Sequence, residues 1–190
     1  MIINKNVCLY VLSLALFCSA CKKEQDLNDR RRWFVFLPDR VTTDIPVDLN
    51  FDGQSHTNLM GELPIDSSSI YVQWTKSNPV ISINWLEPLF NDKVFLKVLP
   101  DTLSDTATIN YLPAAQQYYY HFANGNSVIV PDTKLVNDNI NYYTFEFPDT
   151  LYIENDLLTF TSKQNVFVSR KSHRQIILTA VFRKDREEYR

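Results

Sequence analysis

The feature that most constrains this chain is a two-residue alternation of apolar and polar side chains in many short runs. In the run SIYVQWT, Ile70, Val72 and Trp74 fall on one side of an extended backbone, and QIILTAVF repeats the pattern near the C-terminus. Successive side chains of a β-strand point to opposite faces, so each such run predicts a strand with one buried face. No long helical period appears in the sequence. The chain is therefore predicted to be all-β.

The sequence contains twelve such runs, several of them short, and together they predict about ten strands. In chain order they are WFVFL (33–37), SIYVQWT (69–75), VISINWL (80–86), KVFLKVL (93–99), TATINYL (106–112), QQYYYHF (116–122), VIV (128–130), YYTFEF (142–147), LYI (151–153), LLTF (157–160), VFV (166–168) and QIILTAVF (175–182). Strands at this spacing predict a single antiparallel β-sandwich. A lipocalin-like β-barrel is the alternative that the pattern leaves open.

Turn residues separate the predicted strands. The triplet Asn124-Gly125-Asn126 predicts a hairpin turn. Pro88, Pro113, Pro131 and Pro148 predict strand ends, because proline cannot donate a hydrogen bond to a strand ladder. The run HTNLMGEL, residues 56–63, predicts the one short helix, and the C-terminal run RKDREEYR predicts a solvated end.

The N-terminus carries an export signal. Lys5 precedes an apolar run from Val7 to Cys18, which is shorter than the roughly 20 residues that span a bilayer. Ser19, Ala20 and Cys21 follow, and the chain then turns polar. These residues resemble the lipobox of bacterial lipoproteins. The domain boundaries that follow are a signal peptide over 1–20, a flexible lipidated tether over 21–31 and an all-β domain over 32–190.

The lipobox resemblance implies a lipid anchor. In that family the signal is cut before the cysteine, so Cys21 would carry a diacylglycerol on its sulfur and an acyl chain such as palmitate on its amine. An ordinary secretory signal is the alternative. Lys22 follows the cysteine, as in lipoproteins sent to the outer membrane, and the polar start is similar to that of Bacteroidota lipoproteins. The periplasmic and the surface-facing side both remain open.

The stretch DLNFDGQSHTNL is similar to the first half of an EF-hand calcium loop. Asp48, Asn50 and Asp52 match the first, third and fifth positions, and Gly53 matches the sixth, where the loop turns. The twelfth position holds leucine instead of a bidentate acid, and Glu62 lies three residues later. Bound Ca²⁺ with these four oxygen ligands is one interpretation, and an Asx-rich turn without metal is the other.

Function is less constrained than location. The net charge of −3 argues against nucleic acid as a partner. Trp74 and Trp85 share faces with aliphatic residues, whereas Tyr119 lies between inward-facing neighbours and is the candidate for binding a carbohydrate or protein ligand. We expect a lipid-anchored binding or accessory module of the outer membrane or cell surface. The alternatives are a small hydrolase acting on glycan or peptidoglycan, and a structural component of a surface assembly.

Overall fold

In a computed structural model, the chain is described over residues 32–75, 78–90, 93–94, 102–135 and 145–189. The predicted signal peptide and tether, Cys21 included, lie outside these ranges, as does most of the KVFLKVL run. The strands of the described part are β1 (Arg32–Val47), β2 (His56–Asn58), β3 (Ser69–Trp74), β4 (Val80–Phe90), β5 (Lys93–Val94), β6 (Ile109–Ala123), β7 (Val128–Leu135), β8 (Leu151–Glu154), β9 (Leu157–Ser169) and β10 (Ser172–Tyr189).

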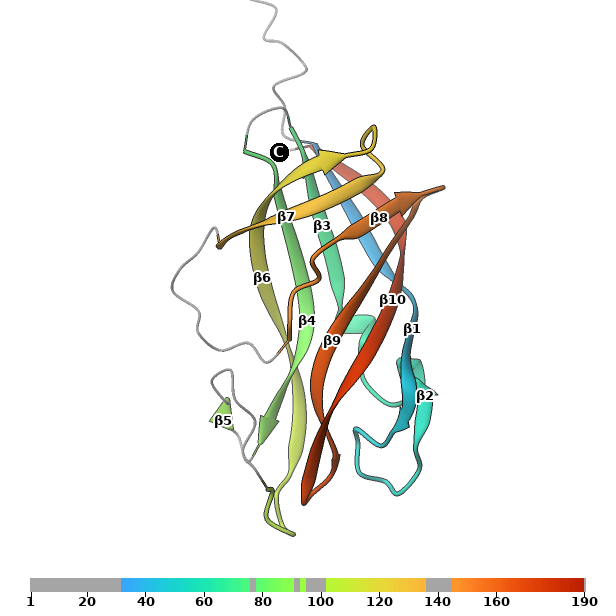
Figure 1. Ribbon diagram of the computed structural model, residues 1–190, viewed down its shortest axis with the longest axis vertical. Coiled ribbons are helices and arrows are strands. Elements are labelled where there is room, and N and C mark those ends of the chain that lie inside the picture. Colours follow the sequence, from blue (N-terminus) through green and yellow to red (C-terminus); the bar gives the residue numbers. More distant parts are fainter. Residues whose placement is uncertain (1–31, 76–77, 91–92, 95–101, 136–144, 190) are drawn as a thin grey trace, which may run out of the picture.

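The strands form one antiparallel sheet that closes into a barrel (Figure 1). The order around the barrel is β1, β3, β4, β6, β7, β8, β9 and β10, and β10 then pairs with β1. The short strands β2 and β5 pair with β1 and β4 off this path. The all-β, antiparallel prediction is confirmed, but the sheet is barrel-like where the sequence favoured a sandwich.

The barrel closes through the two ends of the domain. Strand β10 continues through the charged C-terminal run, and its residue Tyr189 lies opposite Arg32 at the start of β1. The carboxylate of Glu187 accepts hydrogen bonds from Arg32 and, at 2.6 Å, from Lys184. Opposite charges on neighbouring positions thus let a charged sequence remain in the sheet. The predicted solvated end is a barrel strand.

Three of the predicted strand ends are wrong. Strands β4, β6 and β7 continue through Pro88, Pro113 and Pro131, respectively. Strand β3 pairs with β4 only over residues 81–84, and β7 pairs with β6 only from Tyr118 onward. Pro88 therefore lies beyond the end of the β3–β4 pairing, and Pro113 lies beyond the end of the β6–β7 pairing. The missing N–H of each proline breaks no hydrogen bond of that pairing.

Short local elements agree in part with the sequence. The Asn124–Asn126 hairpin is confirmed, with positive φ angles of 50°, 66° and 71° that suit Asn and Gly. The predicted helix over 56–63 is wrong: this stretch forms β2 and then one 3₁₀ turn, η2 (Leu59–Gly61). Another 3₁₀ turn, η3 (Ile65–Ser67), comes after it. No α-helix occurs among the residues described, and none of their helices is long and apolar enough to cross a membrane.

The alternating residues fill the barrel as predicted. Ile70 and Val72 of β3 are fully buried, and so are Ile81 and Ile83 of the neighbouring β4. Trp85 is 5% exposed and stacks on Phe145, with ring centroids 5.0 Å apart. The main core therefore consists of the inward faces of the strands.

Among the residues described, one part of the barrel wall has no strand. Strand β6 pairs with β7 only near its upper half, and β8 pairs with β9 only from Leu151 to Glu154. Residues 145–150 run through the gap below these pairings (Figure 1). The sequence predicts strand over 142–147; the described part of that run, residues 145–147, has no strand pairing. This segment closes the wall by other contacts.

Buried polar side chains hold this segment by its backbone. Gln116 Nε2 donates to the Phe145 carbonyl at 3.0 Å, and Glu87 accepts from the Phe145 N–H at 3.1 Å. Gln164 bonds both the N–H and the carbonyl of Glu146, at 3.2 and 3.0 Å, and Ser162 donates to the same carbonyl. These side chains from β4, β6 and β9 replace the missing ladder and satisfy backbone groups that would otherwise be buried without partners.

Candidate functional site

The lower end of the barrel, where β9 turns into β10, contains a second hydrophobic cluster below the main core (Figure 1). It consists of Leu103, Ala107 and Phe167, with Phe51 and Ile109 packed against it. The cluster is built from the turn before β6, the β9–β10 hairpin and the loop after β1. It forms a plug of loops and strand ends, unlike the main core, which strands enclose.

A cavity of about 60 Å³ lies between this plug and the main core. Its wall includes Trp85, Ile176 and Leu178 from the core, and Phe51 and Phe167 from the plug. The polar groups at its wall belong to Tyr111, Gln164 and Asn165, and no acid, histidine, serine or cysteine is among its described lining residues. The cavity is thus an apolar site with a few neutral polar groups, the usual composition of a small-molecule pocket.

Arg170 joins the parts of the plug. It lies in the β9–β10 turn, and its carbonyl accepts a 2.6 Å hydrogen bond from the N–H of Leu103. Its Nη1 atom donates to the carbonyls of Ala107 and Ser104, at 2.7 and 3.2 Å. The guanidinium carbon also lies 5.4 Å from the centre of the Phe51 ring, within the range of a cation–π contact. One side chain therefore connects three segments that are distant in sequence.

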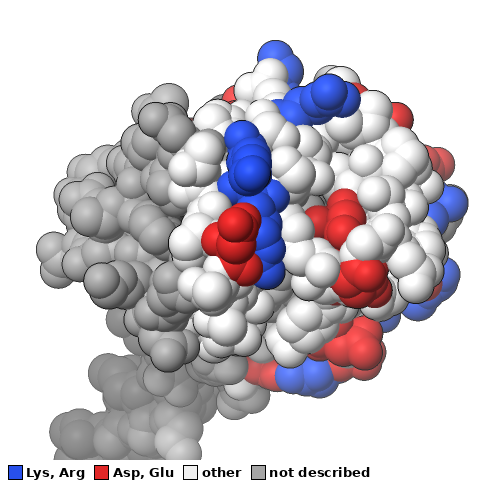
Figure 2. All heavy atoms as spheres, turned by 90° about the horizontal axis from the view of Figure 1, so that it is seen from below, with Lys and Arg blue, Asp and Glu red and all other residues white. Residues whose placement is uncertain are grey.

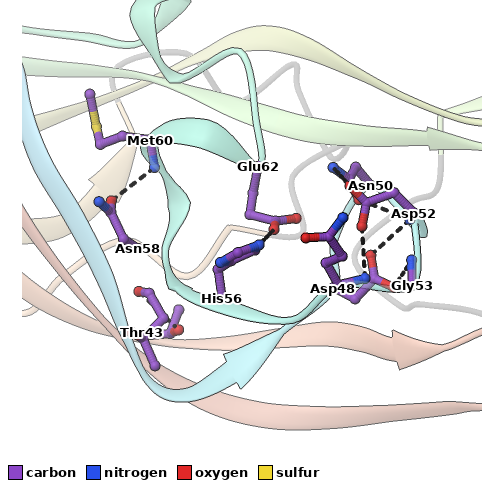
Figure 3. A network of polar contacts seen from close by, with 11 residues as sticks. Thr43, Asp48, Asn50, Asp52, Gly53, His56, Asn58, Met60 and Glu62 are labelled. Carbon is purple, nitrogen blue, oxygen red and sulfur yellow. Dashed lines mark hydrogen bonds and ion pairs between the residues drawn. The ribbon is translucent and has the colours of Figure 1, made fainter.

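The loop that carries Phe51 is the calcium-like stretch of the sequence (Figure 3). The Asp48 carboxylate accepts from the N–H groups of Asp52 and Gly53, at 3.1 and 2.9 Å. The Asn50 side chain accepts from the Asp52 N–H at 3.0 Å and donates to the Asp52 carboxylate at 3.2 Å. These are the bonds of consecutive Asx turns, in which short polar side chains bind nearby backbone. The loop is held by its own side chains.

Phe51 has an unusual backbone conformation within this loop. Its φ angle is +59°, in the left-handed region that bulky residues rarely occupy and that costs of order 1 kcal/mol or more. The N–H of the next residue, Asp52, donates to the side chains of both Asp48 and Asn50, so these hydrogen bonds span Phe51. The loop thus fixes the backbone of Phe51 and points its ring at the plug.

Glu62 is the most deeply buried acid near the loop. Its side chain is 3% exposed, its Oε1 atom lies 3.4 Å from His56 Nε2, and its Oε2 atom is buried without a partner among the described residues. Figure 3 shows it between His56 and the loop of Asp48 and Asp52. Burial raises the pKa of Glu62, His56 lowers it, and Asp52 and Asp48 raise it further.

Tyr111 connects the cavity to the same region. Its hydroxyl donates a 2.8 Å hydrogen bond to the carbonyl of Leu49, next to Asp48. Burial raises its pKa well above the ordinary value, and the charges of Glu62 and Asp48 act in the same direction. The hydroxyl therefore stays neutral and serves as a donor at the cavity wall.

The predicted calcium ligands are close together (Figure 3), and most of their side-chain oxygens are engaged, the exception being Oε2 of Glu62. Asp48, Asn50 and Asp52 bind backbone within the loop, and Glu62 faces His56. Within the ranges that the structure describes, no group of three or more histidine, cysteine, aspartate or glutamate residues has the arrangement of a metal site. These contacts favour the Asx-rich turn, and calcium binding stays a prediction.

The other predicted residues lie away from the cavity. Tyr119 is half-buried opposite Val80 on the outward face of β6, and it does not line the cavity. His121 is exposed, with its Nδ1 atom 3.3 Å from Oδ1 of Asp132. Phe51 and Arg170 were not identified from the sequence. The available signal was a phenylalanine inside an Asn/Asp/Gly turn, a place where an apolar ring is unexpected.

Comparison of the chain with protein-family models, with curated proteins and with solved structures found no match.

Proposed function

We propose that this chain is a lipid-anchored binding module of the outer membrane or cell surface that takes a small apolar group into the cavity at its lower end. The observation that carries the proposal is the cavity itself, an apolar space covered by loops and strand ends. A cavity in a barrel core would otherwise only weaken packing, because each missing contact lowers the stability of the fold.

The size and lining of the cavity indicate the ligand class. A volume of about 60 Å³ has room for roughly four to six water molecules, each needing about 10–15 Å³ by this measure. An engineered apolar cavity that binds one benzene ring measures about 150 Å³, so this smaller cavity has the space of a xenon atom or of a group of a few carbon atoms. A charged group would be costly there because the described lining offers no opposite charge. The ligand, or the part that enters, is therefore uncharged and apolar.

The position of the cavity supports the anchored arrangement. The proposed tether precedes Arg32, which pairs with Tyr189 at the upper end of the barrel (Figure 1). The plug and cavity are at the opposite end. Seen from below, charged side chains lie in small groups of both signs on a largely uncharged surface (Figure 2). The binding end would thus face away from the anchor, without a field that attracts nucleic acid or an anionic surface.

The proposed anchor depends on Cys21. Replacing Cys21 with alanine should abolish incorporation of radiolabelled palmitate and release the chain from the membrane fraction, because the acyl chains supply the membrane affinity. A Ser19→Ala variant, which keeps the cysteine, is the control. Continued labelling of Cys21→Ala would contradict the anchor.

The binding proposal is tested with xenon on the Cys21→Ala chain, since lipid would absorb apolar probes. We expect saturable shifts of the Ile176 and Leu178 methyl NMR signals and a melting temperature that rises with xenon concentration. Val166→Phe adds a ring at the cavity wall and should abolish both effects. Val168→Phe is the matched control, a half-buried valine of β9 outside the lining. Absence of any shift in the unmodified cavity would contradict the proposal.

The hydrolase alternative would require two acids, or a serine with a histidine, converging in a pocket. The described lining of the cavity at the lower end offers neither. Glu146 and Asp149 both line a second pocket, of about 240 Å³, and they are the pair of acids that this alternative would use. The structural-component alternative predicts no ligand, so the xenon titration also separates it from the binding proposal.

A further inference from the structure

Phe51 differs from the strand residues that line the cavity. Trp85, Ile176 and Leu178 extend from barrel strands and are almost fully buried, whereas Phe51 belongs to a loop and is half-buried. Its ring thus has one side at the cavity and part of its surface at solvent. It is also the lining residue that contacts both the second hydrophobic cluster and the guanidinium of Arg170.

We propose that Phe51 determines the size of the group that the cavity accepts, by closing the cavity at its lower end with its ring. The inference rests on the proposed binding function and adds the residue that limits the ligand. In the closed arrangement the cavity of about 60 Å³ takes an uncharged group smaller than an aromatic ring, such as a xenon atom. An aromatic ring needs the additional space that the Phe51 ring occupies.

The backbone of Phe51 is one reason for this assignment. A φ of +59° suits glycine or asparagine, and a phenylalanine there is disfavoured by local sterics. The loop nevertheless holds this conformation through the hydrogen bonds of Asp48 and Asn50. The compensating contacts of the residue are those of its ring, on the cavity, the cluster and Arg170. The position is therefore explained by what the ring covers.

The Phe51 ring can also be replaced without breaking the hydrogen bonds that hold its surroundings. Arg170 is bonded to backbone carbonyls of Ala107 and Ser104 and does not depend on Phe51 for its place. The Asx turns hold the loop through atoms of Asp48, Asn50 and Asp52, none of which belongs to the ring. The ring can therefore be removed or enlarged while both the loop and the Arg170 contacts remain.

The same backbone makes the test sharp. Phe51→Gly removes the ring and relieves the disfavoured φ, so it should fold with a melting temperature close to that of the parent chain. Phe51→Trp is the opposite change, because its larger ring should reduce the volume of the cavity. Phe34→Ala is the matched control, because Phe34 is also a half-buried ring beneath cations, with Lys184 Nζ 4.5 Å from its centre, but it does not line the cavity.

Xenon and benzene are titrated into the Cys21→Ala chain and its variants, with dissociation constants measured from methyl NMR shifts. We expect the parent and Phe34→Ala to bind xenon at least ten-fold more tightly than benzene. Phe51→Gly should bind benzene at least ten-fold more tightly than the parent does, and Phe51→Trp should bind xenon at least ten-fold more weakly.

The outcomes separate the two proposals. If the parent binds xenon but Phe51→Gly and Phe51→Trp keep its ligand preference, Phe51 does not set the size limit and the binding proposal stands. If the parent binds neither probe, the binding proposal fails, and the size limit fails with it. A Phe51→Gly chain that loses its fold would contradict the backbone argument, and Phe51→Trp then still tests the size limit.

Discussion

The least typical single residue of the lower end is Glu62. A carboxylate that is 97% buried, with one oxygen unpartnered among the described residues, is expensive to keep ionised. The sequence marked Glu62 only as a late calcium ligand, because the spacing of a loop gives no information about burial. Its contact with His56 depends on how β2 and η2 fold back, which no local pattern reveals.

Glu62 should therefore make the fold less stable as pH rises. Its pKa is raised in the folded state, so the folded chain binds more protons than the unfolded chain between the ordinary and the raised pKa values. Stability is lost across that window and stays lower above it. We expect the melting temperature of the parent to fall relative to that of Glu62→Gln from about pH 4 to pH 7, measured by calorimetry.

The comparison needs a matched substitution. Glu154→Gln changes an exposed acid of β8 in the same way and should follow the parent at each pH. Parallel curves for the parent and Glu62→Gln would show that burial of Glu62 does not affect its titration. His56→Ala in both backgrounds separates the contribution of the ion pair.

At the scale of elements, the alternation identified most barrel strands because a strand that faces a core has a local signature. Proline positions were misread for a physical reason. Pro88 and Pro113 do lack a donor, but the sequence does not tell which strand edges are paired, and there the second ladder has ended. The same limit applies to Phe145 and Phe147, which alternate like a strand although Gln116 and Gln164 replace its ladder.

The side chains that bond the backbone of Phe145 and Glu146 should stabilise the fold as much as strand pairing would. Gln164→Leu leaves the N–H of Glu146 without a partner and removes one donor to its carbonyl. We expect a loss of about 1–3 kcal/mol in the free energy of unfolding, the typical cost of unsatisfied buried groups, measured by urea denaturation. Gln175→Leu, at an exposed position of β10, is the matched control. An equal loss of stability in both variants would contradict the role of Gln164.

At the scale of the whole molecule, the sequence left sandwich and barrel open because both need the same alternating strands. The decision depends on one pairing, between β1 and β10, whose residues are up to 157 positions apart in the sequence. The sequence does not reveal this pairing, because the charged C-terminal run with Lys184 and Glu187 resembles a solvated tail. Only the structure places Arg32 beside Glu187.

Removing residues 183–190 should therefore open the barrel. The deletion removes the partners of β1 from Arg32 to Leu37 and leaves that edge and its apolar residues uncovered. We expect the cooperative thermal transition to be lost in circular dichroism. A transition near that of the parent would show that closure contributes little to the fold.

A single charge change at the closure is the matched control. Glu187→Gln should cost only about 0.5–1 kcal/mol at pH 7, as expected for a partly exposed ion pair. The pKa of Glu187 is lowered by Lys184 and Arg32, so its contribution is present at neutral pH and is lost as pH falls through that lowered pKa. The pH dependence is thus opposite in sign to that of Glu62.

The pairing of the first strand with the last also determines when folding can finish. Strand β1 lies far before β10 along the chain, so this edge of the barrel has no partner until β10 has been made. Such long-range closure is slow, because loop entropy is lost before the contact forms. The neighbouring ends also mean that a short linker could join Arg32 to Tyr189, with new termini at the Asn124–Asn126 turn. This circular permutant would place β6 last and change the order of folding while it preserves the barrel.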